Sequence, residues 1–161
     1  MGHDLATEEI QDFLNHLSLQ YTQTVKLYLL GGSALCFLGN PRRTVDIDFF
    51  VETSSVEFEN IVEAVAQDLQ LEIEVIAIDE FIPLPADTTS RHRTLGHYGS
   101  IELLSYDPYS IALSKLPRGF DSDIQDVLFL LKIGLIEIEI ITKFVAILYR
   151  WHGTTILIPK S

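Results

Sequence analysis

Two aspartates one residue apart, Asp46 and Asp48, stand inside the apolar stretch TVDIDFFV at residues 44–51. Apolar and polar positions alternate in this stretch, which predicts a strand with both aspartates and Phe50 on one face. The apolar residues expected on the other face are Val45, Ile47, Phe49 and Val51. The pattern therefore predicts a pair of carboxylates that share one side of a strand.

Two carboxylates on such a strand can bind divalent cations. Residues i and i+2 lie about 6.5–7 Å apart on one face, and oxygen ligands of this kind select Mg²⁺ or Mn²⁺. The alternative is a solvated polar edge of an amphipathic strand. Phe50 shares the face of the aspartates, so a metal is the better explanation, because like charges in an apolar setting repel unless a cation or protons intervene.

A second candidate site precedes the aspartates. The apolar run VKLYLL at 25–30 predicts a buried strand, and Gly31, Gly32 and Ser33 follow it directly. Glycines at a junction between a strand and a helix let the backbone approach an anion such as a phosphate, and Ser33 adds a hydroxyl. The alternative is a tight turn without a ligand. Neither the G-x-G-x-x-G pattern nor a Walker motif is present.

Arg42 and Arg43 come directly before the aspartate strand. A guanidinium group suits the geometry of phosphate oxygens, so either arginine could reach a phosphate held at the glycines. The alternative is an ordinary solvated pair of loop residues.

A third group of charged residues lies in SKLPRGFDSDIQD, residues 114–126. Lys115 and Arg118 precede a predicted helix start, and Asp123 and Asp126 share one face of that helix at spacing i, i+3. From the residues alone, helix capping with surface ion pairs is slightly favoured over a catalytic role for this segment.

The elements that position these residues follow from periodicity and from Gly, Pro and capping signals. We expect helices at 7–22, 33–39, 55–69, 107–116, 121–134 and 137–150, and strands at 25–30, 44–51, 71–78 and 100–106. Residues 79–99 are expected to be irregular with one short strand. The expected helix caps are Thr7, Asp107, and Asp121 or Ser122. The order predicts an α/β fold with a mixed sheet, as one domain over 1–161, with a core at about 25–106 and a helical part at about 107–150.

The chain has 161 residues and a net charge of −12, from 23 acidic and 11 basic residues. Such a charge argues against a general nucleic-acid binder, because it repels polyanions at long range. The single cysteine, Cys36, predicts an inert core thiol and a cytoplasmic protein. No signal peptide is recognisable, and no apolar run reaches the roughly 18 residues of a membrane span.

The motif GGSALCFLG followed by RRTVDIDFFVE, with DPYSIALSKLPRGFDSDIQDVLFLL after it, resembles the nucleotidyltransferase superfamily. The second part is similar to the lysine-then-aspartate motif of the AbiEii-type and MenT-type branch, which includes toxins of toxin–antitoxin systems. The resemblance spans about residues 25–135. It implies a nucleotidyltransferase-like core with helices on the sheet and a short C-terminal helical part.

The resemblance also implies roles for particular residues. Gly31, Gly32 and Ser33 would hold the triphosphate of an NTP. Asp46 and Asp48 would bind Mg²⁺ or Mn²⁺ as catalytic residues. Lys115 and either Asp123 or Asp126 would match the second motif. The superfamily usually has a third carboxylate on another strand, for which Glu74 and Glu102 both qualify.

The resulting functional prediction is a metal-dependent nucleotidyltransferase that transfers NMP from an NTP to an acceptor. The acceptor classes are an RNA such as tRNA, a protein hydroxyl or a small molecule, and a cognate toxin or antitoxin protein is a further expected partner. The alternative is a catalytically degenerate module with this fold, which binds a nucleotide or a partner protein as an antitoxin or regulator.

Overall fold

The computed structural model describes residues 4–52, 55–76 and 87–152. By its internal contacts the chain divides into two compact units. Unit 1 comprises Met1–Ala77 and Arg93–Tyr106, and unit 2 comprises Ile78–His92 and Asp107–Ser161. Each unit is described below by itself.

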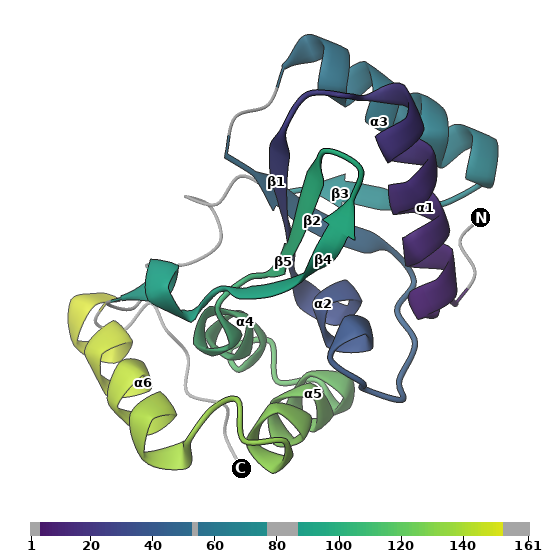
Figure 1. The fold of residues 1–161 in the computed structure, drawn as a ribbon. Coiled ribbons are helices and arrows are strands. Elements are labelled where there is room, and N and C mark those ends of the chain that lie inside the picture. The colour runs from purple at the N-terminus through teal and green to yellow at the C-terminus, as the bar shows by residue number, and fades with distance from the viewer. Residues whose placement is uncertain (1–3, 53–54, 77–86, 153–161) are drawn as a thin grey trace. The chain divides into compact units, whose positions relative to one another are not determined.

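Unit 1 is built on a five-stranded mixed sheet of order β3-β2-β1-β5-β4 (Figure 1). The strands are β1 (Val25–Leu29), β2 (Ile47–Val51), β3 (Ile73–Val75), β4 (Arg93–Tyr98) and β5 (Ile101–Ser105). β1 runs antiparallel to β2 and parallel to β5, β2 runs parallel to β3, and β4 runs antiparallel to β5. β4 is the short strand expected between 79 and 99, whereas residues 77–86 lie outside the described residues.

The helices of unit 1 are α1 (Thr7–Gln20), α2 (Gly31–Phe37) and α3 (Val56–Leu69). Helices α1 and α3 pack against each other beside one face of the sheet, and α2 contacts β2 (Figure 1). The apolar side of α1 is buried as its spacing predicts, through Ile10, Phe13, Leu14 and Leu17. On that side of the sheet Phe13 meets Phe49 of β2, with ring centroids 6.3 Å apart. The expected mixed α/β fold is confirmed.

Unit 2 contains a short 3₁₀ helix (Thr88–Arg91), α4 (Pro108–Lys115), α5 (Asp121–Lys132) and α6 (Ile138–His152). The start of α4 confirms the sequence prediction. Asp107 accepts a hydrogen bond from the Tyr109 N–H at 3.0 Å, and Pro108 occupies the first turn, where a missing N–H does no harm. The carboxylate of Asp107 also accepts two hydrogen bonds from Arg91, at 2.9 and 2.8 Å.

Several expected element boundaries are wrong. β2 begins at Ile47, so Asp46 precedes the strand and Val45 is 54% exposed rather than buried. The N-cap of α1 is Ala6 and not the expected Thr7. Thr7 lies in the first turn, and its hydroxyl donates to the Cys36 carbonyl at 3.1 Å. The residue before α5 is Phe120, whose N–H donates to the Asp123 carboxylate at 3.3 Å; neither Asp121 nor Ser122 is the cap.

Candidate active site

Three carboxylates meet at one edge of the sheet in unit 1. Asp46 lies immediately before β2, Asp48 lies within it, and Glu74 of β3 is the direct cross-strand partner of Asp48. Each offers an oxygen atom, and these atoms all lie within 4.8 Å of one another. Asp46 and Asp48 are half-buried, whereas Glu74 is exposed. We call Asp46, Asp48 and Glu74 the acidic triad.

The third carboxylate follows from strand order. Glu102 lies on β5, on the far side of β1 from β2, and its cross-strand partners are Lys26 and His97. Glu74 instead lies on the strand that pairs with β2. The structure therefore brings Glu74 to the paired aspartates, a choice that the sequence left open.

The glycine turn, Gly31–Ser33, forms the beginning of α2 and is attached to β2. The Leu30 N–H donates to the Asp48 carbonyl at 2.9 Å. The Ser33 hydroxyl is fully buried; it donates to the Leu30 carbonyl at 2.8 Å and accepts from the Asp48 N–H at 3.3 Å. These bonds fix the backbone of Asp48 to the helix start. The predicted contact of Ser33 with a phosphate stays a prediction.

Both glycines stand where a side chain would collide with the site. Gly31 has φ +53°, and a Cβ on it would lie 2.8 Å from Oδ2 of Asp48. A Cβ on Gly32 would lie 2.8 Å from the Thr44 hydroxyl. Glycine tolerates positive φ and has no Cβ, so Gly31 lets α2 begin directly against Asp48, and Gly32 lets it pass close to Thr44.

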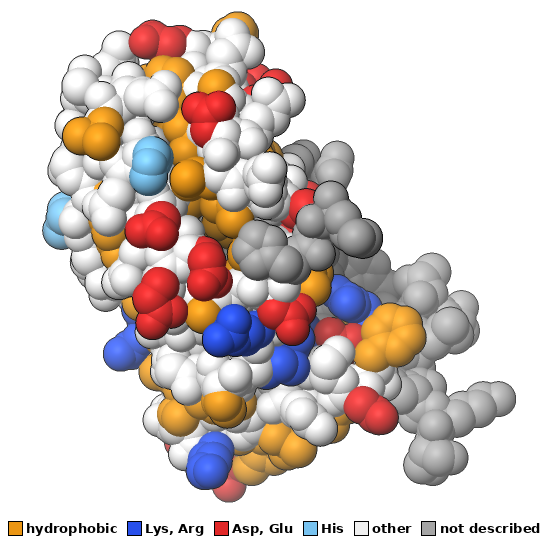
Figure 2. All heavy atoms as spheres, turned by 90° about the vertical axis from the view of Figure 1, so that its right-hand side faces the viewer, with side chains coloured by type: hydrophobic (Ala, Val, Ile, Leu, Met, Phe, Trp, Pro, Cys, Tyr) orange, Lys and Arg blue, Asp and Glu red, His pale blue; other side chains and the backbone are white. Residues whose placement is uncertain are grey.

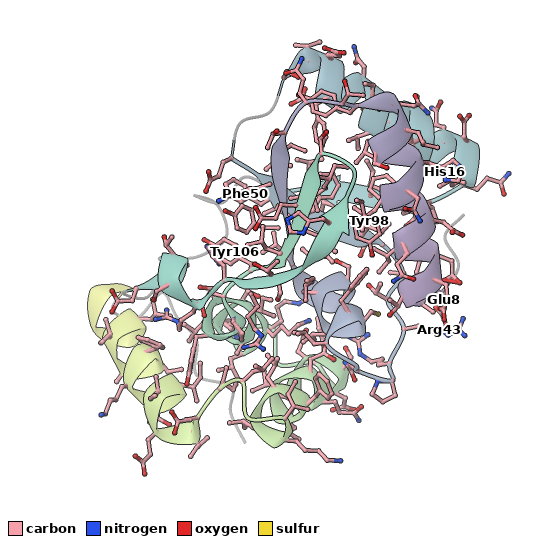
Figure 3. The ribbon with its side chains drawn as sticks, in the orientation of Figure 1. Glu8, His16, Arg43, Phe50, Tyr98 and Tyr106 are labelled. Carbon is pink, nitrogen blue, oxygen red and sulfur yellow. The ribbon has the colours of Figure 1, made fainter. Side chains whose placement is uncertain are left out.

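The two arginines of the preceding loop point to different places. Nη2 of Arg42 would lie 3.8 Å from a Cβ on Gly32, so its guanidinium lies beside the glycine turn. Arg43 is exposed at the N-terminal end of α1 (Figure 3), where Leu5 and Thr44 form an isolated bridge. The structure thus brings Arg42 to the turn, and Arg43 to the start of α1.

An aromatic group adjoins the acidic triad on the same face of β2. The Tyr28 ring lies 5.7 Å from that of Phe50 and 6.0 Å from that of Tyr106, measured between centroids. The Tyr28 hydroxyl donates to the Glu52 carboxylate at 3.2 Å. Burial first, and then the charge and hydrogen bond of Glu52, raise the pKa of Tyr28 to about 12. Sequence reasoning missed this group because its members are far apart in the sequence: Tyr28 lies in β1, Phe50 in β2, and Tyr106 just after β5.

In unit 2, the charged residues of the second motif form a buried ion cluster. The Lys115 ammonium lies 2.9 Å from Oδ2 of Asp126 and 3.8 Å from Oδ1 of Asp123. Arg118 adds a contact of 3.4 Å to Asp123 from an exposed position. We call Lys115, Asp123 and Asp126 the lysine cluster. Surface ion pairs, the simpler interpretation of this segment, do not describe it, because all three side chains are buried.

The family of the chain follows from comparison with known proteins. The model of a family described as "Nucleotidyltransferase of unknown function (DUF6036)" matches residues 7–151. The chain belongs to this family. Membership implies a nucleotide substrate and agrees with the superfamily resemblance, but it does not extend to the AbiEii-type and MenT-type branch.

A solved structure supports the same fold. The chain is similar to an antigenic nucleotidyltransferase-like protein from Paracoccidioides brasiliensis, with a TM-score of 0.54 and 15% sequence identity. The match covers 92% of this chain and 91% of the other. No curated protein matches the sequence significantly. Among the helices of the described residues, none has the length and apolar character needed to cross a membrane.

Proposed function

We propose that this family member is an active, metal-dependent nucleotidyltransferase that transfers NMP from an NTP to an acceptor hydroxyl. The supporting observation is the acidic triad, which gathers at the edge of β2 directly against the glycine turn. Carboxylates that repel one another need a compensating cation, and a triphosphate arrives with one.

The residues of the acidic triad fit a hard divalent cation. All three donors are carboxylate oxygens, which Mg²⁺ and Mn²⁺ prefer. Gly31 adds to the fit, because a Cβ there would lie 2.8 Å from Oδ2 of Asp48 and would push that carboxylate aside. Asp46, Asp48 and Glu74 are therefore the proposed ligands.

When bound there, a divalent cation would neutralise charge on the triphosphate and on the leaving pyrophosphate. The glycine turn would admit the β and γ phosphates close to the backbone, and the Arg42 guanidinium beside it would bind their oxygens. A carboxylate of the acidic triad would accept the proton of the acceptor hydroxyl as it attacks the α-phosphorus. The chain thus supplies positioning, charge and a base.

Lys115 and Asp123 remain proposed catalytic residues on the strength of the second motif. In the structure the Lys115 ammonium contacts Asp126 more closely than Asp123. We propose that Asp126 holds the Lys115 ammonium in place.

The acceptor is proposed from charge. Acidic side chains are distributed over the face that includes α1 (Figure 2), and the net charge is −12. An RNA acceptor such as a tRNA end would therefore make only local contacts, because a wider approach meets repulsion. A protein hydroxyl or a small molecule avoids that repulsion. A role within a toxin–antitoxin pair is the corresponding proposal for partners.

The test is nucleotide transfer. Each NTP, labelled at the α-phosphate, is incubated with Mg²⁺ or Mn²⁺ and with a tRNA pool, a protein extract or a metabolite extract. We expect label transfer and pyrophosphate release that require the metal. Asp46→Asn should reduce the rate on the order of a thousandfold, because a proposed ligand loses its charge.

The matched control is Asp68→Asn, an exposed aspartate on α3, which should retain wild-type activity. Wild-type protein that transfers no label from any NTP, or Asp46→Asn protein as active as wild type, would contradict the proposal. Nucleotide-dependent thermal stabilisation without transfer would instead support the regulatory module.

A further inference from the structure

Phe49 and Phe50 are neighbours in sequence and lie on opposite faces of the sheet. Phe49 is fully buried against α1. Phe50 is only half-buried, and it lies on the same face as Asp48, two residues along the strand. Residues i and i+2 of a strand lie about 6.5–7 Å apart on one face, so the exposed part of the Phe50 ring is an apolar surface next to the acidic triad.

The rings of two buried tyrosines, Tyr28 and Tyr106, pack against the ring of Phe50. Tyr28 of β1 is its direct cross-strand partner, and Tyr106 meets it edge-on with centroids 6.3 Å apart and planes at 89°. Both tyrosines are buried, at 4% and 3% exposure. Figure 3 shows Phe50 and Tyr106 together on the side of the sheet away from α1. The exposed part of Phe50 is therefore a supported aromatic surface rather than a loose side chain.

The charges around this surface select what can cover it. Asp48 lies on the same face of β2 two residues before Phe50, and Glu52, just after β2, accepts a hydrogen bond from the Tyr28 hydroxyl at 3.2 Å. The Glu52 carboxylate repels phosphate groups, and it accepts hydrogen bonds from amino groups. A nucleobase fits both conditions, since it is planar, uncharged and carries N–H donors.

We propose that Phe50 stacks on the base of the incoming nucleotide. This inference rests on the proposed function, which places the triphosphate at the acidic triad and the glycine turn. The base then lies one sugar away from the α-phosphate, next to the aromatic surface of Phe50, Tyr28 and Tyr106. Phe50 acts as a positioning residue for the nucleotide.

The experiment compares binding of two probes by calorimetry in the presence of Mg²⁺: an NTP and inorganic tripolyphosphate, which has no base. Phe50→Leu keeps apolar volume and removes the ring. We expect it to weaken NTP binding about fivefold to a hundredfold, the range for loss of one aromatic–base stack. Tripolyphosphate binding should stay unchanged. Phe50→Trp keeps an aromatic face and should retain NTP binding.

The matched control is Phe129→Leu, which alters a half-buried phenylalanine of α5 and should change neither affinity. Equal NTP binding by wild type and Phe50→Leu would overturn the stacking proposal and leave the proposed function intact. If wild type binds neither probe with Mg²⁺, the proposed function fails and the stacking proposal fails with it. Circular dichroism checks folding, and Phe50→Met replaces Phe50→Leu if the latter does not fold.

Discussion

The acidic triad of unit 1 and the lysine cluster of unit 2 both gather carboxylates, but they differ in what those carboxylates face. In the lysine cluster, Asp126 and Asp123 lie 2.9 and 3.8 Å from the ammonium of Lys115. In the acidic triad, the oxygen atoms lie within 4.8 Å of one another. In the lysine cluster the negative charge is compensated by a side chain of the protein. In the acidic triad the carboxylates repel one another and favour binding of an external cation.

This difference separates two similar sequence patterns. D-x-D on a strand and D-x-x-D on a helix both place two aspartates on one face. The partner of the carboxylates decides the consequence. Loss of Lys115 should lower the stability of the fold, whereas loss of a triad carboxylate should lower metal binding and nucleotide transfer and leave the fold intact.

The largest expected effect on stability is that of Lys115→Met. It leaves the buried carboxylates of Asp123 and Asp126 without their ammonium partner, and breaking a buried pair costs about 3–5 kcal/mol. Urea denaturation measures the free energy of unfolding. Lys132→Met, which alters an exposed lysine of α5, is the control and should change stability by less than about 0.5 kcal/mol. Equal stabilities of the two variants would show that the lysine cluster is not a stabilising ion pair.

The next effect concerns metal binding. Mg²⁺ or Mn²⁺ at about 100 times its Kd should stabilise the wild-type protein by roughly 2.7 kcal/mol. Glu74→Gln should remove most of this stabilisation, and Glu102→Gln should leave it intact, because only Glu74 lies in the acidic triad. Thermal unfolding with and without metal measures both. The reverse result would assign the third carboxylate to Glu102.

A smaller effect is expected for Gly31→Ala. Positive φ costs an L-residue about 1–2 kcal/mol, and the new Cβ would displace the Asp48 carboxylate. Gly39→Ala is the matched control, since Gly39 also has positive φ, at +101°, but has no atom within 4 Å of a Cβ. Both variants should lose stability, and only Gly31→Ala should also lose metal-dependent stabilisation. Normal metal binding by Gly31→Ala would show that the acidic triad binds its metal without the close approach of Gly31.

The smallest effect concerns the negative charge of Glu52 and the pKa of Tyr28. Glu52→Gln should lower the pKa of Tyr28 from about 12 toward 10.0 without reaching it, because burial, the largest cause, persists. The raised pKa favours folding below pH 10, and this contribution is lost as the pH rises through about 12. NMR of ¹³C-labelled tyrosine, assigned with Tyr28→Phe, follows the titration. Glu57→Gln on α3 should leave it unchanged.

The sequence predicted the local features well. Alternation predicted β2, helical spacing predicted the buried face of α1, and the Asp-Pro pair predicted the start of α4. These features depend on neighbours in the chain, so a short window contains their cause. The predicted start of β2 is too early. The alternation of apolar and polar residues includes Val45, whereas the pairing with β3 begins only at Ile47 and the pairing with β1 only at Phe49.

The features that the sequence could not provide depend on strand order. Glu74 and Glu102 both lie in alternating strands, and only the pairing of β3 with β2 selects Glu74. The aromatic surface joins side chains of β1 and β2 with Tyr106, just after β5. The buried role of the Ser33 hydroxyl depends on β2 packing against α2. Each requires a long-range contact that periodicity does not encode.

The position of β1 in the sheet has a consequence for synthesis on the ribosome. β1 pairs with β2 on one side and with β5, residues 101–105, on the other. Until β5 has emerged, the edge of β1 that β5 later covers stays open to other chains. The parallel β1–β5 pair also joins distant segments, which slows folding. Until residues 101–105 have emerged, the nascent chain therefore carries β1 without one of the two strands that pair with it.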